Sequence, residues 1–206
     1  MAGKSKPGRA SRRSRLPALG NVEQGDLPAL VVGLGNPGRK YRGTRHNAGF
    51  MAADRIIEGG RLVNRATWPD GELWLVEAAG RRFLVLKPVT YMNLSGRAVA
   101  PLLKSYGLVP ERMIVIHDDI DIPLGEVRTK EGGGTGGHRG LASLVEFLGD
   151  AGFTRIRVGV GRPPEGLDPA DYVLTRFLDG EAEQAGASVE KAAAAALDLL
   201  TGAEVG

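Results

Sequence analysis

The chain has 206 residues, of which 42% are hydrophobic and 25% are charged. This balance indicates one globular domain with a buried core and excludes a fibrous protein. The absence of cysteine excludes disulfides, thiol nucleophiles and thiolate metal sites. The apolar runs are far shorter than the roughly 20 residues that cross a bilayer, and no secretory segment follows the start, so we expect a cytoplasmic protein.

The net charge of +3 arises from the first 22 residues, which contain six basic residues and no acidic residue. The rest of the chain has 21 basic and 24 acidic residues, a net charge of −3. We therefore expect residues 1–28 to form a basic, disordered extension and residues 29–206 to form the catalytic domain. A basic arm that adds salt-sensitive affinity for RNA and a transit peptide are the alternatives for the extension.

Apolar runs of strand length alternate with segments of helical period, beginning with a strand at 29–34 and a helix at 48–57. This alternation predicts an α/β sandwich in a single domain. Further strands are expected at 62–66, 73–78, 83–86, 113–117, 125–129 and 156–160, and helices at 95–106, 141–148 and 182–200. Glycines are placed to end these helices, and Asp179 is placed to cap the last one.

Unusual polar residues follow three of the predicted strands. His46 and Asn36 come after the first strand, Asn93 follows the strand at 83–86, and Asp118 follows the strand at 113–117. Loops at strand ends form the ligand sites of open α/β sheets, so these side chains could meet in one cleft. A histidine with an orienting carboxylate can activate water, and asparagine amides can donate to an oxyanion.

Each of these residues also has a plain structural interpretation. His46 could be an ordinary hydrogen-bonded side chain, and Asn93 could cap the next helix. Asp118 could lie in a solvated turn, with Asp119 and Asp121 as competing candidates.

Five glycines lie within residues 132–137, which we call the glycine-rich loop, and His138 and a predicted helix follow it. Free backbone N–H groups at such a position can bind an anion. Arg128, Lys130 and Arg139 flank the loop, which favours binding of an RNA phosphate. The alternative is a mobile loop whose glycines serve only the turn.

Several short motifs occur together: GLGNPG at 33–38, TRHN at 44–47, YMNLSG at 91–96, the pair His117-Asp118, and GGGTGGHRGL at 132–141. Together they resemble bacterial-type peptidyl-tRNA hydrolases in order and spacing, from Leu30 to the final helix. The resemblance implies a three-layer sandwich in which helices flank a mixed twisted sheet. It also implies a monomer without a cofactor that acts on peptidyl-tRNA.

The resemblance implies catalytic roles for four residues. His46 would be the general base, Asp118 would orient it, Asn36 would hold the attacking water or His46, and Asn93 would donate to the peptide main chain or the oxyanion. Substrate-binding positions would be Tyr41 beside the 3′-terminal adenosine, Met92 on the peptide side, and Arg128, Lys130 and Arg157 along the tRNA. From the glycine-rich loop itself we add Gly136 and the adjacent Arg139 as candidates for binding the tRNA.

Two positions depart from the family pattern. The family usually has asparagine after the histidine of the glycine-rich motif, where this chain has Arg139, and a basic residue where this chain has Ala142. Arg139 could bind a phosphate or disturb the position of the peptide or water.

Three other classes of protein compete with this interpretation. Gly33, Gly35 and Gly38 match the spacing of a dinucleotide-binding loop, although no helix is predicted within the motif. A magnesium or manganese hydrolase could use His117, Asp118, Asp119 and Asp121. A non-catalytic RNA-binding or splicing relative on the same fold would not need both a base and its orienting carboxylate.

Overall fold

The computed structural model describes residues 29–202; the expected basic extension, residues 1–28, lies outside them. One seven-stranded sheet has the order β2-β3-β4-β1-β5-β7-β6. Its centre is parallel, because β1 pairs in parallel with β4 and β5, and β5 with β7, while the remaining pairs are antiparallel. The strands are β1 (Leu30–Gly33), β2 (Arg61–Trp68), β3 (Gly71–Ala78), β4 (Arg81–Pro88), β5 (Met113–Asp119), β6 (Val127–Glu131) and β7 (Thr154–Gly159).

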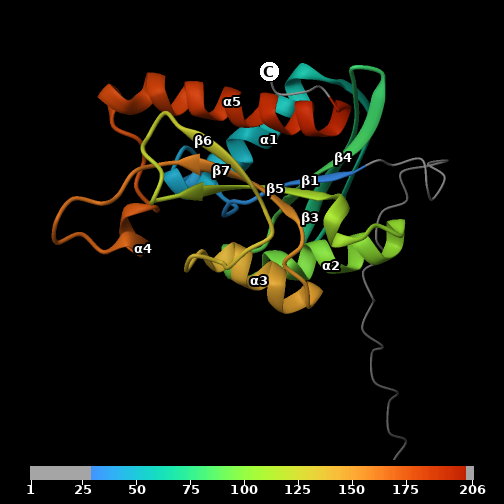
Figure 1. The fold of residues 1–206 in the computed structure, drawn as a ribbon, viewed down its shortest axis with the longest axis horizontal. Coiled ribbons are helices and arrows are strands. Elements are labelled where there is room, and N and C mark those ends of the chain that lie inside the picture. The colour runs from blue at the N-terminus through green and yellow to red at the C-terminus, as the bar shows by residue number, and fades with distance from the viewer. Residues whose placement is uncertain (1–28, 203–206) are drawn as a thin grey trace, which may run out of the picture.

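Helices cover both faces of this sheet, which confirms the predicted three-layer sandwich. Figure 1 shows α1 and α5 on one face and α2 and α3 on the other. The α-helices are α1 (Ala48–Gly59), α2 (Ser95–Tyr106), α3 (Arg139–Leu148), α4 (Pro169–Tyr172) and α5 (Ala182–Thr201). Among the described residues, no helix combines the length and apolar character needed to span a membrane.

Two apolar cores lie on the two faces of the sheet. β1 is buried along its whole length, as expected for a central parallel strand. Val32 points into the core beneath α2 and α3, whereas Val31 points into the core beneath α1 and α5. The period-2 alternation of strand side chains thus divides a continuous apolar run between both layers.

Glycines bring α1 unusually close to the sheet. A Cβ added to Gly49 would lie 2.2 Å from the Ile116 carbonyl oxygen, and one added to Gly33 would lie 2.4 Å from the Gly49 carbonyl oxygen. The turn before α1, η2 (Arg45–Asn47), therefore lies directly against the carboxyl end of β5. This contact places His46 beside Asp118.

The structure corrects two predicted boundaries. The strand expected at 125–129 is β6, Val127–Glu131, because Gly125 has a φ of 96° and the Glu126 N–H closes a turn onto Pro123. The prediction that Asp179 caps the last helix is wrong. Residues Asp179–Glu181 form a 3₁₀ turn, η5, in which the Glu181 carboxylate accepts from the Leu178 N–H.

Candidate active site

His46 lies in η2 with 8% of its surface exposed. Its backbone N–H donates to the Val173 carbonyl at 2.8 Å, and this hydrogen bond attaches the turn to a segment more than 100 residues later in the chain. Its Nδ1 lies 2.8 Å from Oδ1 of Asp118, at the end of β5. An ionised carboxylate only accepts hydrogen bonds, so Nδ1 carries a proton, and in the neutral ring Nε2 is the atom with the lone pair. Nε2 has no partner among the described residues, and the ring lines a cavity.

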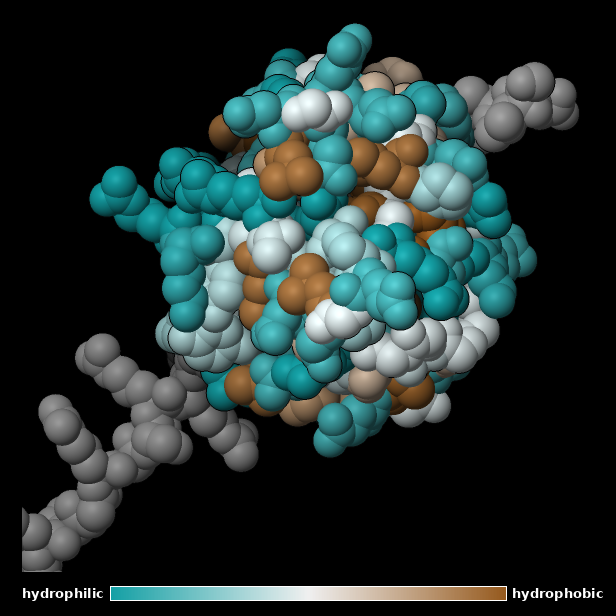
Figure 2. Space-filling model, turned by 90° about the vertical axis from the view of Figure 1, so that its left-hand side faces the viewer, coloured by the Kyte–Doolittle hydropathy of each residue, from teal (hydrophilic) through white to brown (hydrophobic). Residues whose placement is uncertain are grey.

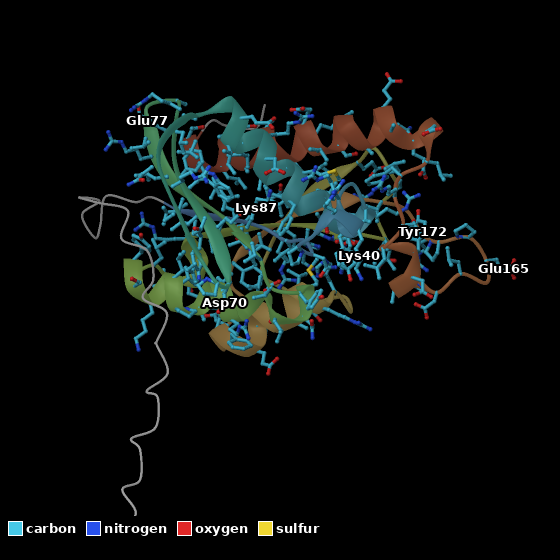
Figure 3. The ribbon with its side chains drawn as sticks, turned by 180° about the vertical axis from the view of Figure 1, so that it is seen from behind. Lys40, Asp70, Glu77, Lys87, Glu165 and Tyr172 are labelled. Atoms are coloured by element: carbon cyan, nitrogen blue, oxygen red, sulfur yellow. The ribbon has the colours of Figure 1, made fainter. Side chains whose placement is uncertain are left out.

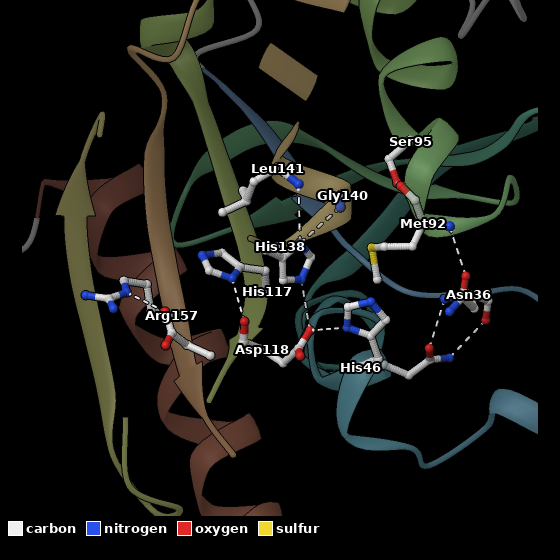
Figure 4. A network of polar contacts seen from close by, with 12 residues as sticks. Asn36, His46, Met92, Ser95, His117, Asp118, His138, Gly140, Leu141 and Arg157 are labelled. Carbon is white, nitrogen blue, oxygen red and sulfur yellow. Dashed lines mark hydrogen bonds and ion pairs between the residues drawn. The ribbon is translucent and has the colours of Figure 1, made fainter. Parts of the chain in front are cut away.

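His138 is a second partner of Asp118 that the sequence interpretation missed. It caps α3, and its Nδ1 accepts from the backbone N–H groups of Gly140 and Leu141 at 3.1 and 3.3 Å. Nδ1 is therefore unprotonated, and Nε2 donates to Asp118 Oδ1 at 3.0 Å. Figure 4 shows both histidine rings converging on this one carboxylate. The only sequence signal was a histidine at a predicted helix start.

The environment keeps Asp118 ionised. Burial by itself would raise its pKa, but the attraction of His138 and His46 and the hydrogen bonds from both rings outweigh burial, and the pKa lies well below its ordinary value of 3.8. Asp118 can therefore orient neutral His46 and stabilise the imidazolium that forms when Nε2 accepts a proton.

His117 lines the same cavity but is a poor candidate for the base. Its Nδ1 donates to the Asp118 carbonyl at 2.7 Å, and its Nε2 is buried without a partner in the described residues. Burial lowers its pKa to about 3. The ring therefore remains neutral.

Asn36 joins the two loops on the other side of His46. Its backbone exchanges two hydrogen bonds with the Asn47 side chain, at 2.8 and 3.0 Å, and its Oδ1 accepts from the Met92 N–H at 2.9 Å. Because Oδ1 is used, the amide NH₂ remains to donate into the cavity. No hydrogen bond between Asn36 and His46 occurs in residues 29–202, so holding His46 directly, one of its two expected roles, is not observed. Asn47 itself was not predicted as a site residue.

Asn93 lies in the 3₁₀ turn η3 (Met92–Leu94), with its side chain exposed and without a hydrogen bond to the described chain. The interpretation of Asn93 as a helix cap is wrong, because α2 has no side-chain cap at its N-cap residue, Leu94. The Asn93 amide is therefore free to bind substrate.

One cavity of about 800 Å³ brings these groups together. Of the residues predicted from the sequence, Arg128 alone does not line it; it lies on the exposed side of β6, paired with Glu126 at 2.8 Å. The others that line it are Asn36, Tyr41, His46, Met92, Asn93, Asp118, Lys130, Gly136, Arg139 and Arg157. Figure 2, which faces the side of α4, shows small apolar patches among mainly hydrophilic residues.

Basic side chains from β6 and β7 occupy one part of this cavity. Arg157 donates from Nε to Asp119 at 2.8 Å, whereas Lys130 forms no ion pair within residues 29–202. The sequence interpretation missed Arg155, which is buried, stacks on Phe153 and donates to the carbonyl oxygens of Gly133 and Gly134. Burial lowers the pKa of Arg155, with a smaller contribution from repulsion by Arg157.

The metal site proposed from the sequence is not assembled. Asp119 pairs with Arg157 and Asp121 with Arg162, while His117 directs Nδ1 to a backbone carbonyl. A different group, His46, Asp118 and His138, could approach one ion. Its hydrogen bonds oppose this use, because the His138 atom facing Asp118 carries a proton when Nδ1 accepts from two N–H groups.

The dinucleotide interpretation also disagrees with the structure. After Gly38, which has a φ of 100°, the chain forms the 3₁₀ turn η1 (Arg39–Tyr41), and α1 begins only at Ala48. No α-helix starts within the glycine motif, so no helix dipole faces a pyrophosphate there.

The mixed sheet, with a buried carboxylate hydrogen-bonded to a histidine at the carboxyl ends of its strands, defines an α/β protein whose site has the groups that general-base chemistry requires. Residues 30–205 match the family profile described as Peptidyl-tRNA hydrolase. The chain belongs to the peptidyl-tRNA hydrolase family.

Similar proteins agree with this assignment. The peptidyl-tRNA hydrolase of Geobacter sulfurreducens is 56% identical over 153 residues, which cover 74% of this chain and 78% of the relative. That of Frankia alni is 46% identical over 183 residues, 88% of this chain and 92% of the relative. The crystal structure of peptidyl-tRNA hydrolase from Acinetobacter baumannii has a TM-score of 0.79 and 34% identity, covering 84% of this chain and 89% of the other.

Proposed function

We propose that this enzyme hydrolyses the ester bond between a peptide and tRNA, with His46 as the general base. The observation that carries the proposal is the buried His46–Asp118 hydrogen bond, 2.8 Å long, in a chain of this family. It leaves the Nε2 lone pair of His46 at the cavity. The chain contains no cysteine that could act as a thiol nucleophile. In the proposed reaction the nucleophile is water, and no covalent intermediate forms.

In the proposed step, Nε2 of His46 takes a proton from water as the water oxygen bonds to the ester carbonyl carbon. The imidazolium then gives this proton to the ribose oxygen as the ester C–O bond breaks. Asp118 stabilises the transient charge on the ring without accepting the proton itself. The donor amides of Asn36 and Asn93 would hold the water and the oxyanion, and one such donor could contribute about 3 kcal/mol in the transition state.

The remaining predicted residues would hold the two ends of the substrate. Tyr41 and Met92 line the same cavity as Asn93. We assign Tyr41 to the 3′-terminal adenosine and Met92 to the peptide. We propose that tRNA phosphates lie along the other part, against the glycine-rich loop with Gly136 and the cations Lys130, Arg139 and Arg157, and continue outside the cavity to Arg128 on β6. Arg139 has no ion-pair partner in residues 29–202 and can therefore bind an anion, which suits a phosphate better than the peptide.

We also propose that the protein acts as a monomer and in the cytoplasm. Every group assigned to the reaction comes from one chain, so a second copy is not needed to complete the site. The proposed substrate is a product of translation, which places the enzyme in the same compartment as the ribosome.

The test is release of tRNA from purified peptidyl-tRNA, measured with the full chain in a chelator. We expect turnover by the unaltered protein and a loss of kcat of at least about 100-fold in His46→Ala and in Asp118→Asn. Binding of tRNA should persist in both variants. Bound tRNA without turnover by the unaltered protein would instead identify a non-catalytic RNA-binding relative, and activity lost only in chelator would identify a metal hydrolase.

A further inference from the structure

Arg45, the residue directly before His46, is a buried cation. Only 2% of its surface is exposed. Its Nη2 forms an ion pair with Glu181 Oε2 at 2.6 Å, and Nε and Nη1 are buried without a hydrogen-bond partner in the described residues. A buried charge held by one carboxylate is costly unless its surroundings compensate. The Arg45 guanidinium therefore requires compensation from groups other than Glu181.

Two aromatic rings supply part of that compensation. The Arg45 guanidinium lies 4.4 Å from the ring centre of Tyr172 and 4.9 Å from that of Phe177. Both distances are within the range of a cation–π interaction. The Tyr172 hydroxyl donates to the Val160 carbonyl at 2.9 Å, so the ring beneath Arg45 is itself fixed.

The partner carboxylate is fixed as well. Glu181 Oε2 also accepts from the Leu178 N–H at 2.8 Å. Burial opposes ionisation of Glu181, but the Leu178 N–H and Arg45 together keep the pKa of this carboxyl below its ordinary value. Among the described residues, the ion pair and the cation–π contacts of the Arg45 guanidinium are therefore all with residues 172–181, which we call the 172–181 segment.

Backbone hydrogen bonds attach the turn of His46 to the same 172–181 segment. The N–H groups of Arg45 and His46 donate to the carbonyls of Thr175 and Val173 at 3.0 and 2.8 Å, and Thr44 forms an antiparallel bridge with Arg176. Side chain and backbone therefore join the turn of His46 to the same segment. Val173 and Leu174 of this segment also line the active-site cavity.

We propose that Arg45 and Glu181 form a positioning pair that sets the direction in which His46 presents Nε2 to the substrate. This inference rests on the proposed function of His46. Asp118 fixes Nδ1, the ring nitrogen that does not face the substrate. A hydrogen bond at one ring atom still leaves the backbone of the turn free to shift. The Arg45–Glu181 pair fixes that backbone to the 172–181 segment, so the base and one wall of the cavity are held together as one unit.

The test uses Glu181→Gln and Arg45→Lys. Gln keeps the size of Glu but removes its charge, and Lys keeps the charge but removes the planar fork. A displacement of the base by a fraction of an ångström should lower kcat, whereas substrate binding away from His46 should persist. We expect kcat for peptidyl-tRNA hydrolysis to fall about 10- to 100-fold in each variant, with KM changed by less than about twofold.

The matched control is Glu77→Gln. Glu77 accepts from Arg61 and Arg82 at 2.6 and 3.0 Å on the β2–β4 part of the sheet, and Figure 3 shows it at the opposite end of the molecule from Tyr172. We expect its kcat and KM to match those of the unaltered protein. An equal loss of kcat in this control would overturn the proposal.

The double variant Arg45→Met/Glu181→Met separates positioning from stability. Apolar replacement of a buried ion pair often preserves or raises stability, so this variant should unfold at about the same temperature as the unaltered protein and yet have low kcat. Full recovery of kcat would show that the ion pair serves stability alone and would overturn the proposal.

A measurement made without substrate tests the position of His46 independently of the hydrolytic activity. The NMR signals of the His46 ring should shift in Glu181→Gln and stay unchanged in Glu77→Gln. If the unaltered protein releases no tRNA but these shifts appear, the proposed hydrolysis fails while the positioning of His46 stands. If tRNA is released normally by Glu181→Gln and no shift appears, the positioning pair fails alone.

Discussion

Two neighbouring basic residues of the cavity differ in what their charges contact. Arg155 is 3% exposed and directs its guanidinium at two carbonyls of the glycine-rich loop. Lys130, its register partner across β6 and β7, is exposed. Only Lys130 has a free charge that can replace counterions along a phosphate chain. Arg155 instead holds the loop in shape.

This difference predicts two responses to salt. In Lys130→Gln we expect the slope of log Kd for tRNA against log salt concentration to fall by about one, because one phosphate contact is lost. In Arg155→Lys we expect weaker binding with the slope unchanged, because the loop loses its fork of hydrogen bonds but no phosphate contact is removed. Filter binding at several salt concentrations measures both slopes. A reduced slope in Arg155→Lys would mean that Arg155 contacts phosphate directly.

Residue types and their places after strands are sufficient to predict that His46, Asp118, Asn36 and Asn93 share a cleft. They are not sufficient to predict His138 or Asn47. His138 reaches Asp118 only because it caps α3 with its other nitrogen, and Asn47 acts through the backbone of Asn36. Such contacts depend on side-chain directions that spacing along the chain does not determine.

At the scale of the helices, glycine has different structural roles in α1 and α5. Gly49 is buried against the Ile116 carbonyl, whereas Gly186, within α5, is exposed with no atom within 4 Å of an added Cβ. The first glycine permits close packing of helix on sheet, and the second only adds freedom to the unfolded chain.

We therefore expect opposite effects of the same substitution. Gly49→Ala should lower the free energy of unfolding by about 1–3 kcal/mol, because the helix must move away from the sheet. It should also lower activity, because η2 would move with α1. Gly186→Ala should raise the free energy of unfolding by about 0.5–1 kcal/mol with activity unchanged. Urea unfolding of both variants checks the signs; equal effects would contradict the packing argument.

The helical period predicts α1 and α2 closely, because each has a long amphipathic face and a clear end: α2 ends at Gly107 in the left-handed conformation, as expected. The helical period and the expected cap do not predict the start of α5 correctly. There, Asp179 resembles a cap, but the carboxylate of Glu181 takes the Leu178 N–H and a 3₁₀ turn precedes the helix. Asp179 accepts no capping hydrogen bond among the described residues, and the Glu181 carboxylate instead joins the Leu178 N–H to Arg45.

For the whole molecule, buried His117 and Asp118 should make stability depend on pH. The pKa of His117 is lowered from 6.5 to about 3, so between these values the unfolded chain binds a proton that the folded chain does not. Stability from this group is complete above pH 6.5 and is lost as the pH falls toward 3. The pKa of Asp118 is also lowered, from 3.8, so acidification below that value removes further stability.

We expect the free energy of unfolding to fall by about 1.4 kcal/mol per pH unit through the His117 window. In His117→Asn the amide can replace the Nδ1–H donor but does not titrate, so the slope between pH 6 and 4 should be smaller than in the unaltered protein. Urea unfolding across this range measures the difference. Equal slopes in the two proteins would mean that His117 is protonated in the folded state.

The alternation of strands and helices predicts the α/β class of the whole molecule, but it does not predict the order of the strands. β1 lies between β4 and β5, and both pairings are parallel and join segments more than 50 residues apart. Several strand orders would satisfy the same local pattern. The packing of four helices on two faces, which selects one order, is a property of the assembled fold.

Among the strands of residues 29–202, β6 ends the sheet with one edge unpaired and is largely exposed, with Arg128, Lys130 and Glu131 along it. Charged side chains on such an edge discourage another chain from adding a strand there. The cations proposed to bind RNA therefore also guard against self-association. Neutralising several of them at once to weaken the proposed tRNA binding would therefore be expected to open this edge to aggregation.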